Sequence, residues 1–112
     1  MTDIAEIEVP AARVALDDGA LLLDVREQQE WDAGHAPGAR HVPLGELPDR
    51  MGELAGTGPV VVVCRSGHRS ALATEWLTSA GFDAVNLAGG MQAWAAAHLA
   101  VVTDDGTPGH VA

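Results

Sequence analysis

The chain has 112 residues, 47% of them hydrophobic, which is typical of one globular domain. Its 16 acidic residues against six basic ones give a formal net charge of -10 at pH 7, which disfavours nucleic acid and anionic membrane surfaces as partners. Residues 1–10 lack the features of an export signal, and the apolar runs fall far below the roughly 20 residues of a membrane-spanning helix. We therefore expect a cytoplasmic protein with a single domain over 1–103 and a flexible tail over 104–112.

The first half of the chain alternates strand and helix patterns. In chain order the predicted elements are a strand over 7–9, a helix over 10–16, a strand over 20–25, a helix over 27–32, a strand over 40–42 and an amphipathic helix over 44–54. Residues 20–25 are apolar except for Asp24, as expected of a strand covered on both faces. Leu44, Leu47, Met51 and Leu54 recur at helical spacing.

The second half continues the alternation. Its predicted elements are a strand over 60–63, a helix over 72–80 with Gly81 as its cap, a strand over 84–87 and a helix over 91–99. Four consecutive valines in the first of these strands indicate burial on both faces. The pattern predicts an α/β fold: a small, open, mostly parallel five-stranded sheet with helices on both faces. Ligands bind beyond the carboxyl ends of such strands, where Cys64 lies.

The segment from Cys64 to Ser70 leaves a buried strand and enters a helix. Backbone N–H groups at such a helix start have no intrahelical partner and can converge on an anion. A cysteine there has its thiolate favoured by the helix terminus and by Arg65 and Arg69, which makes it a nucleophile. Gly67 supplies the backbone freedom for the tight curve.

The distribution of charge supports a functional reading of this loop. The chain has no lysine, two of its six arginines lie in the loop, and no acidic residue occurs between Glu53 and Glu75. A cysteine after four valines can also be a small buried hydrophobic residue. The composition of the loop favours the nucleophile over that alternative.

The residues resemble the single-domain rhodanese family, whose loop has the pattern Cys-x-x-Gly-x-Arg-Ser. Four blocks occur in the family's order between about Leu21 and Trp94: Leu23-Asp24-Val25-Arg26 with Glu30-Trp31, Gly34 to Ala39 with Pro43-Leu44, Cys64 to Ser70, and Leu87 to Met91 with Ala93-Trp94. Ala36 departs from the family's usual branched apolar residue, which concerns packing.

The resemblance implies a sulfurtransferase that moves a sulfane sulfur from a donor such as thiosulfate to Cys64, and from this persulfide to cyanide or a thiol. The partners expected are these small molecules, with a protein thiol as a further acceptor. By the same resemblance, the residues that bind the donor are Arg65, Ser66, Gly67, His68 and Arg69. We expect Asp24 to support the loop, with Arg26 and Arg69 as candidate partners. No cofactor is indicated.

Other polar and aromatic residues are interpreted as structural. Glu27, Glu30 and Asp32 are expected to form a solvated helix face. His35 is assigned to its turn, and no spacing of histidines with Cys64 indicates a metal. The three tryptophans, Trp31, Trp76 and Trp94, are expected to pack in the core or at its rim.

Two other functions remain open. A cysteine-dependent phosphatase or arsenate reductase can use the same fold, but those relatives place five residues between cysteine and arginine. Four residues separate Cys64 from Arg69, and the shorter loop suits one sulfur atom better than a tetrahedral oxyanion. A non-catalytic regulatory module is the other alternative, which the intact loop disfavours. The physiological donor, the acceptor and the oligomeric state are not determined by the sequence.

Overall fold

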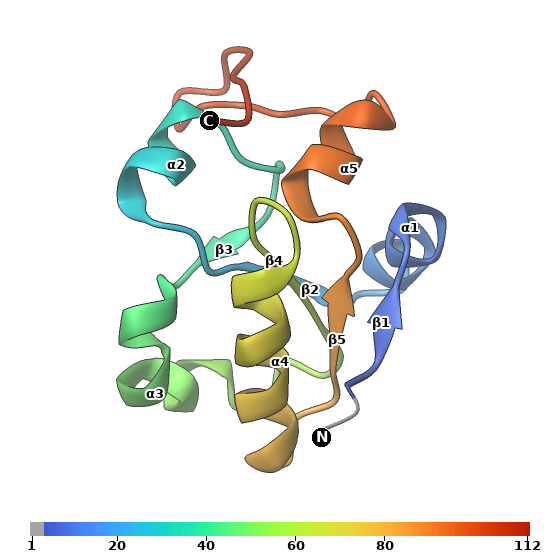
Figure 1. Ribbon diagram of the computed structural model, residues 1–112, viewed down its shortest axis with the longest axis vertical. Coiled ribbons are helices and arrows are strands. Elements are labelled where there is room, and N and C mark those ends of the chain that lie inside the picture. The colour runs from blue at the N-terminus through green and yellow to red at the C-terminus, as the bar shows by residue number, and fades with distance from the viewer. Residues whose placement is uncertain (1–3) are drawn as a thin grey trace.

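The computed structural model describes residues 4–112 and shows a central sheet flanked by helices (Figure 1). In chain order its elements are β1 (Glu6–Ile7), α1 (Val9–Asp17), β2 (Leu21–Asp24), α2 (Gln28–Ala33), β3 (Arg40–His41), α3 (Leu47–Arg50) between two 3-10 turns (Leu44–Glu46 and Met51–Leu54), β4 (Val60–Val63), α4 (His68–Ser79), β5 (Ala84–Leu87) and α5 (Gly90–Ala96). The five strands lie in the order β1-β5-β4-β2-β3, and every neighbouring pair is parallel. The predicted α/β fold is confirmed.

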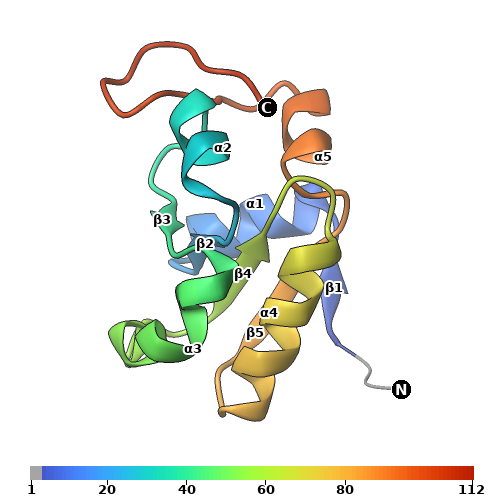
Figure 2. The same ribbon diagram turned by 60° about the vertical axis from the view of Figure 1, so that its left-hand side comes forward.

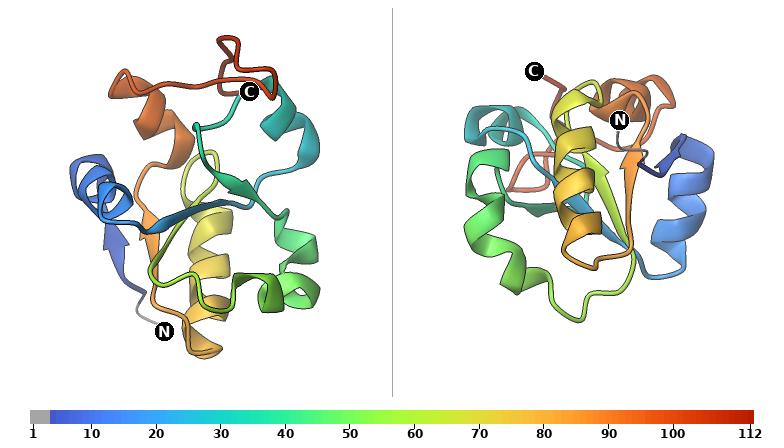
Figure 3. Two further views of the ribbon diagram at one scale, coloured as in Figure 1. Left: turned by 180° about the vertical axis from the view of Figure 1, so that it is seen from behind. Right: turned by 60° about the horizontal axis from the view of Figure 1, so that its bottom comes forward.

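The two faces of the sheet each carry a core. Val60 and Val62 of β4 pack into one cluster with residues of α3 and α4. Val61 and Val63 pack into the other, with residues of α1 and α5. Helices accordingly lie on both sides of the sheet, as Figure 2 and the two views of Figure 3 show. All four residues of β4 are apolar because both faces of this strand are buried.

The helix expected over residues 44–54 is wrong, because only Leu47–Arg50 is α-helical, between two 3-10 turns. In a continuous helix the amide of residue 48 would donate to the carbonyl of Leu44. Pro48 has no such amide, and its ring would clash with that carbonyl. Proline is tolerated in the first turn, where α3 places it.

Several element ends also differ from those expected. The first strand is Glu6–Ile7, because α1 already begins at Val9. Helix α4 begins at His68, directly after the loop, and α5 ends at Ala96. Gly81 was expected to cap α4, but the C-cap residue is Ala80. Gly81 follows it in a left-handed conformation with φ of +93°.

The segment after α5 runs beside α2 at the end of the molecule that carries the β4–α4 loop (Figure 1). The amide of His110 donates to the carbonyl of Ala33 at 3.0 Å, and the Trp31 indole donates to Asp104 at 3.2 Å. The domain boundary at 103 and the flexibility of the segment beyond it stay predictions. Among the described residues, no helix has the length and apolar character needed to cross a membrane.

Candidate active site

Cys64 lies directly after β4 and is 1% exposed. The loop of residues 64–67 then turns the chain from the sheet into α4. Gly67, the residue before the first turn of α4, has φ of +112°, a left-handed conformation that side chains disfavour. A turn this tight brings the start of α4 back over the cysteine.

Two donors contact the sulfur of Cys64. The amide of Gly67 donates to Sγ at 3.1 Å, and the Ser70 hydroxyl donates at 3.2 Å. Burial raises the pKa of the Cys64 thiol, but the hydrogen bonds from the Ser70 hydroxyl and from the amides of Ser70, Gly67 and Ser66 outweigh it. The pKa of Cys64 is therefore lower than usual, and the reactive thiolate is more abundant near neutral pH.

The carbonyl groups of the loop are held away from the sulfur by the next strand and helix. The amide of Met91 donates to the Cys64 carbonyl at 2.8 Å, and the amide of Gln92 donates to that of Arg65 at 3.0 Å. The side-chain amide of Asn86 donates to the Gly67 carbonyl at 3.1 Å. These three carbonyls are thus bound by donors of β5 and α5, whereas the amide of Gly67 donates to the Cys64 sulfur.

Close packing at Gly90 makes this arrangement possible. A Cβ at residue 90 would overlap the carbonyl oxygen of Cys64 and would lie 2.6 Å from that of Arg65. The φ of Gly90 is also +58°, in the left-handed region. The first turn of α5 can thus approach the loop only through a residue without a side chain.

The predicted donor-binding residues differ in where they lie. Arg65, Ser66 and His68 are exposed, whereas Gly67 is buried and Arg69 is partly buried. The Arg65 side chain donates through Nε to the carbonyl of Ala112 at 2.9 Å. The Arg65 side chain is thus exposed on the outer side of the loop.

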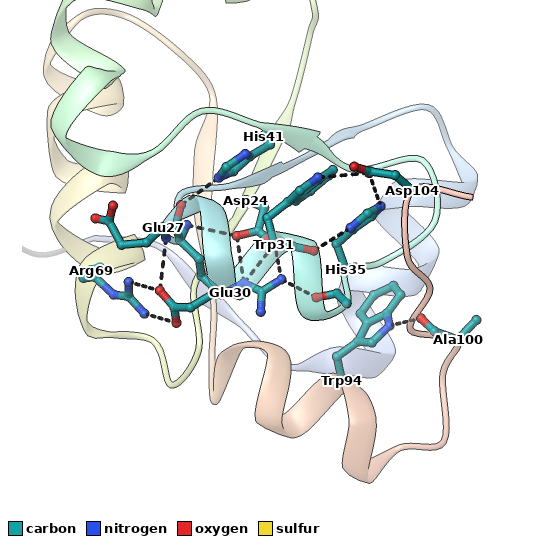
Figure 4. A network of polar contacts seen from close by, with 12 residues as sticks. Asp24, Glu27, Glu30, Trp31, His35, His41, Arg69, Trp94, Ala100 and Asp104 are labelled. Atoms are coloured by element: carbon teal, nitrogen blue, oxygen red, sulfur yellow. Dashed lines mark hydrogen bonds and ion pairs between the residues drawn. The ribbon is translucent and has the colours of Figure 1, made fainter. Parts of the chain in front are cut away.

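Arg69 forms a bidentate ion pair with Glu30 of α2, at 2.6 and 2.8 Å (Figure 4). The Glu30 side chain is only 17% exposed. The expectation that Glu30 belongs to a solvated helix face is therefore wrong, because its carboxylate is mostly buried and is bound by Arg69. Arg69 lies 39 residues away in the chain, so the local charge pattern did not reveal this contact. The signal in the sequence was its place in the Glu30-Trp31 block that carries the family resemblance.

Asp24 has Arg26 as its partner. The two side chains are fully buried, and Arg26 donates to the carboxylate through Nε and through Nη2 at 2.8 Å. Nη2 also donates to the carbonyl of Gly34, at the end of α2. The pair ties β2 to the end of the helix that carries Glu30. That is an indirect route by which Asp24 can support the loop.

A stack of aromatic rings packs Trp31 of α2 against His41 of β3 and against His35 (Figure 4). The ring of Trp31 lies parallel to that of His35 at 3.6 Å and to that of His41 at 4.7 Å, measured between centroids. Nδ1 of His35 lies 3.0 Å from the carbonyl of Trp31, and Nε2 of His41 lies 2.7 Å from that of Arg26. These contacts fit the structural interpretation of His35.

Comparison with known proteins agrees with the geometry. The Rhodanese-like domain model matches residues 9–97, and the chain therefore belongs to the rhodanese-like domain family. The chain is 38% identical over 94 residues to the Bacillus subtilis protein named "Putative sulfurtransferase YtwF", covering 82% of this chain and 91% of that protein.

Two further relatives extend the comparison. "Putative sulfur carrier protein YrkF" of B. subtilis is 38% identical over 96 residues, covering 83% of this chain, which spans only 52% of that longer protein. A rhodanese-related protein from Thermoplasma volcanium has the same fold, with a TM-score of 0.81 and 30% identity over 89% of this chain and 99% of its own. The family and the fold are thus supported by sequence and by structure.

Proposed function

We propose that the protein is a sulfurtransferase that carries a sulfane sulfur as a persulfide on Cys64. Thiosulfate or a similar compound is the donor, and cyanide or a thiol is the acceptor. The observation that carries this proposal is the buried Cys64 sulfur with hydrogen bonds from Gly67 and Ser70. The names of the relatives, a sulfurtransferase and a sulfur carrier, support the same chemistry.

The proposed reaction has two displacement steps. The Cys64 thiolate attacks the sulfane sulfur of thiosulfate, forming an S–S bond while sulfite leaves with the electron pair of the broken bond. Cyanide then attacks the outer sulfur and leaves as thiocyanate, which returns the Cys64 thiolate. A thiolate acceptor would react in the same way and leave as a persulfide.

The loop residues have separate roles in this proposal. The amides of Ser66 and Gly67 stabilise negative charge on the thiolate and then on the persulfide. Arg65 attracts the anionic donor, and His68 lines the approach to the loop. Arg69 holds the start of α4 in place through its ion pair, and Asp24 supports α2 through Arg26.

An intact-mass measurement after incubation with thiosulfate tests the covalent step. The wild-type protein should gain the mass of one sulfur atom, lose it on addition of cyanide, and release thiocyanate. Cys64→Ser should gain nothing, because the hydroxyl is a far weaker nucleophile. A chain that never gains sulfur from thiosulfate, or from an organic persulfide, would contradict the proposal and favour a non-catalytic module.

The phosphatase alternative is tested by comparing substrates. A phosphoryl group needs more donors around its equatorial oxygens than a loop of this length offers. We expect kcat/KM for thiosulfate to exceed that for an aryl phosphate by at least about a hundredfold. Comparable values would favour the phosphatase. A cytoplasmic location and a protein thiol as a further acceptor remain predictions.

A further inference from the structure

The guanidinium group of Arg69 has its two terminal nitrogens on one carboxylate. Nη1 and Nη2 donate to the two oxygens of Glu30 at 2.6 and 2.8 Å. Glu30 is held in turn by the backbone amide of Glu27, which donates to it at 3.0 Å. This is the bidentate geometry that an arginine offers to any planar or tetrahedral oxyanion. Glu30 therefore takes the two donors that such a ligand would use.

The pair is partly shielded from solvent, because the Glu30 side chain is 17% exposed and that of Arg69 is 34% exposed. Hydrogen bonds from Arg69 are the main reason that the pKa of Glu30 falls to about 2. Glu30 is therefore ionised at every pH at which the enzyme would be assayed. Its negative charge cancels the positive charge of Arg69.

Arg69 lies in the first turn of α4, the helix that begins directly after the Cys64 loop. Hydrogen bonding to Glu30 is the main cause that raises the pKa of Arg69, and the negative charge of Cys64 adds to the shift. Arg69 is only two residues after Gly67 and directly precedes Ser70, whose hydroxyl contacts Sγ. Without the carboxylate of Glu30, this guanidinium would be available to bind another anion at the start of α4.

We propose that Glu30 is a specificity-determining residue of the Cys64 site. By occupying Arg69, it prevents this arginine from binding the oxygens of a phosphate ion at the loop. The site then favours a donor that can enter with a sulfur atom toward the loop amides, as thiosulfate can, over phosphate, which has only oxygens to present. This inference rests on the proposed function only in taking Cys64 as the nucleophile.

Glu30→Gln tests the inference with little disturbance of the helix. Glutamine keeps the shape of the side chain and suits the third helical position, where it can still accept from the Glu27 amide. The readout is the protection of Cys64 by inorganic phosphate against alkylation with iodoacetamide, at low ionic strength. We expect the apparent Kd for phosphate to fall about fivefold or more in Glu30→Gln, because charged contacts to an anion are strong.

Two controls separate Glu30 from a general effect of charge. Asp32→Asn removes one negative charge from the same helix, where Asp32 accepts from Gln28 and not from Arg69, and it should leave phosphate protection unchanged. The double variant Glu30→Gln, Arg69→Gln should return to the wild-type Kd, because the gain depends on the freed guanidinium. Circular dichroism melting verifies that each variant is folded.

The expected result is tighter phosphate binding in Glu30→Gln alone. Equal tightening in Asp32→Asn, persistent tightening in the double variant, or unchanged or absent phosphate protection in Glu30→Gln would each overturn the inference. Alkylation requires only the thiolate. A failure of the sulfurtransferase proposal, seen as no gain of sulfur mass, is therefore distinguishable from a failure of this one.

Discussion

Ser70 donates a hydrogen bond through its buried hydroxyl to the sulfur of Cys64 at 3.2 Å. It lies in the first turn of α4, so the helix places the hydroxyl beside the sulfur that the loop surrounds with amides. Burial opposes ionisation of the thiol, and this hydroxyl makes the largest contribution in the opposite direction. The ionisation of Cys64 thus depends on a side chain of the helix as well as on the loop.

Ser70→Ala should raise the pKa of Cys64. The hydroxyl favours the thiolate, so its removal shifts ionisation toward higher pH, and both alkylation of Cys64 and kcat/KM should begin to rise at a higher pH than in the wild type. The pH dependence of the iodoacetamide reaction measures the shift. Ser79→Ala, an exposed position at the end of the same helix, is the matched control. An unchanged midpoint in Ser70→Ala would contradict the assigned role.

Arg65→Ala should raise KM for thiosulfate about threefold to tenfold with little change in kcat. An exposed guanidinium at the outer side of the loop attracts the ground state and the transition state alike, which is uniform binding. Steady-state kinetics at several salt concentrations check this, because an exposed charge is screened and the difference from wild type should shrink as salt rises. A loss confined to kcat, or one independent of salt, would argue against the role.

Asn86→Asp should loosen the loop. The change replaces the donor of the bond to the Gly67 carbonyl with a carboxylate, and it places that carboxylate beside Glu6, which accepts from the same amide at 2.9 Å. We expect kcat/KM to fall roughly tenfold to a hundredfold, since small displacements of a reacting group have such effects.

A second variant separates the two consequences of Asn86→Asp. Adding Glu6→Gln removes the repulsion between carboxylates and provides a donor, so thermal stability should recover in part. The bond to the Gly67 carbonyl stays absent, so kcat/KM should not recover. Thermal melting and steady-state kinetics on the single and double variants distinguish these effects. Parallel recovery of both quantities would refute a specific role for the bond to the loop.

Gly90→Ala should destabilise the protein by about 2 to 4 kcal/mol and lower kcat/KM. The added methyl group would overlap the Cys64 carbonyl, and alanine disfavours the φ of +58° at this position. Gly52→Ala is the control, because a Cβ there meets nothing within 4 Å. Denaturant unfolding monitored by circular dichroism measures the difference. Similar effects of the two substitutions would show that packing at Gly90 is unimportant.

The strands and most helices could be predicted because their signals are local. Four consecutive valines indicate a strand buried on both faces, and this is what β4 is. The failure at residues 44–54 has a different origin: the apolar spacing there is helical, but Pro48 interrupts the hydrogen bonding that a continuous helix needs. Apolar periodicity shows which face of a segment is buried, but it does not show whether the backbone is α-helical or 3-10.

The site could be predicted only in part. The proposal that Cys64 carries the sulfur follows from its position after a buried strand and before a helix. Glu30, Asn86 and Ser70 act through contacts made in the folded chain, and two of them lie in segments far from the loop in sequence. Ser70 was part of the motif but carried no assigned role, since spacing alone does not show where a hydroxyl points.

Cys64 is the only cysteine of the chain, and it is almost fully buried. A sulfenic acid formed by oxidation at this position has no neighbouring thiol with which to condense into an internal disulfide, the usual protection against irreversible oxidation. A persulfide likewise has no resolving cysteine in the same chain. Under the proposed function, discharge of the sulfur and repair of an oxidised Cys64 would thus both require an encounter with a second molecule, and at low concentrations of that molecule both rates should rise in proportion to it.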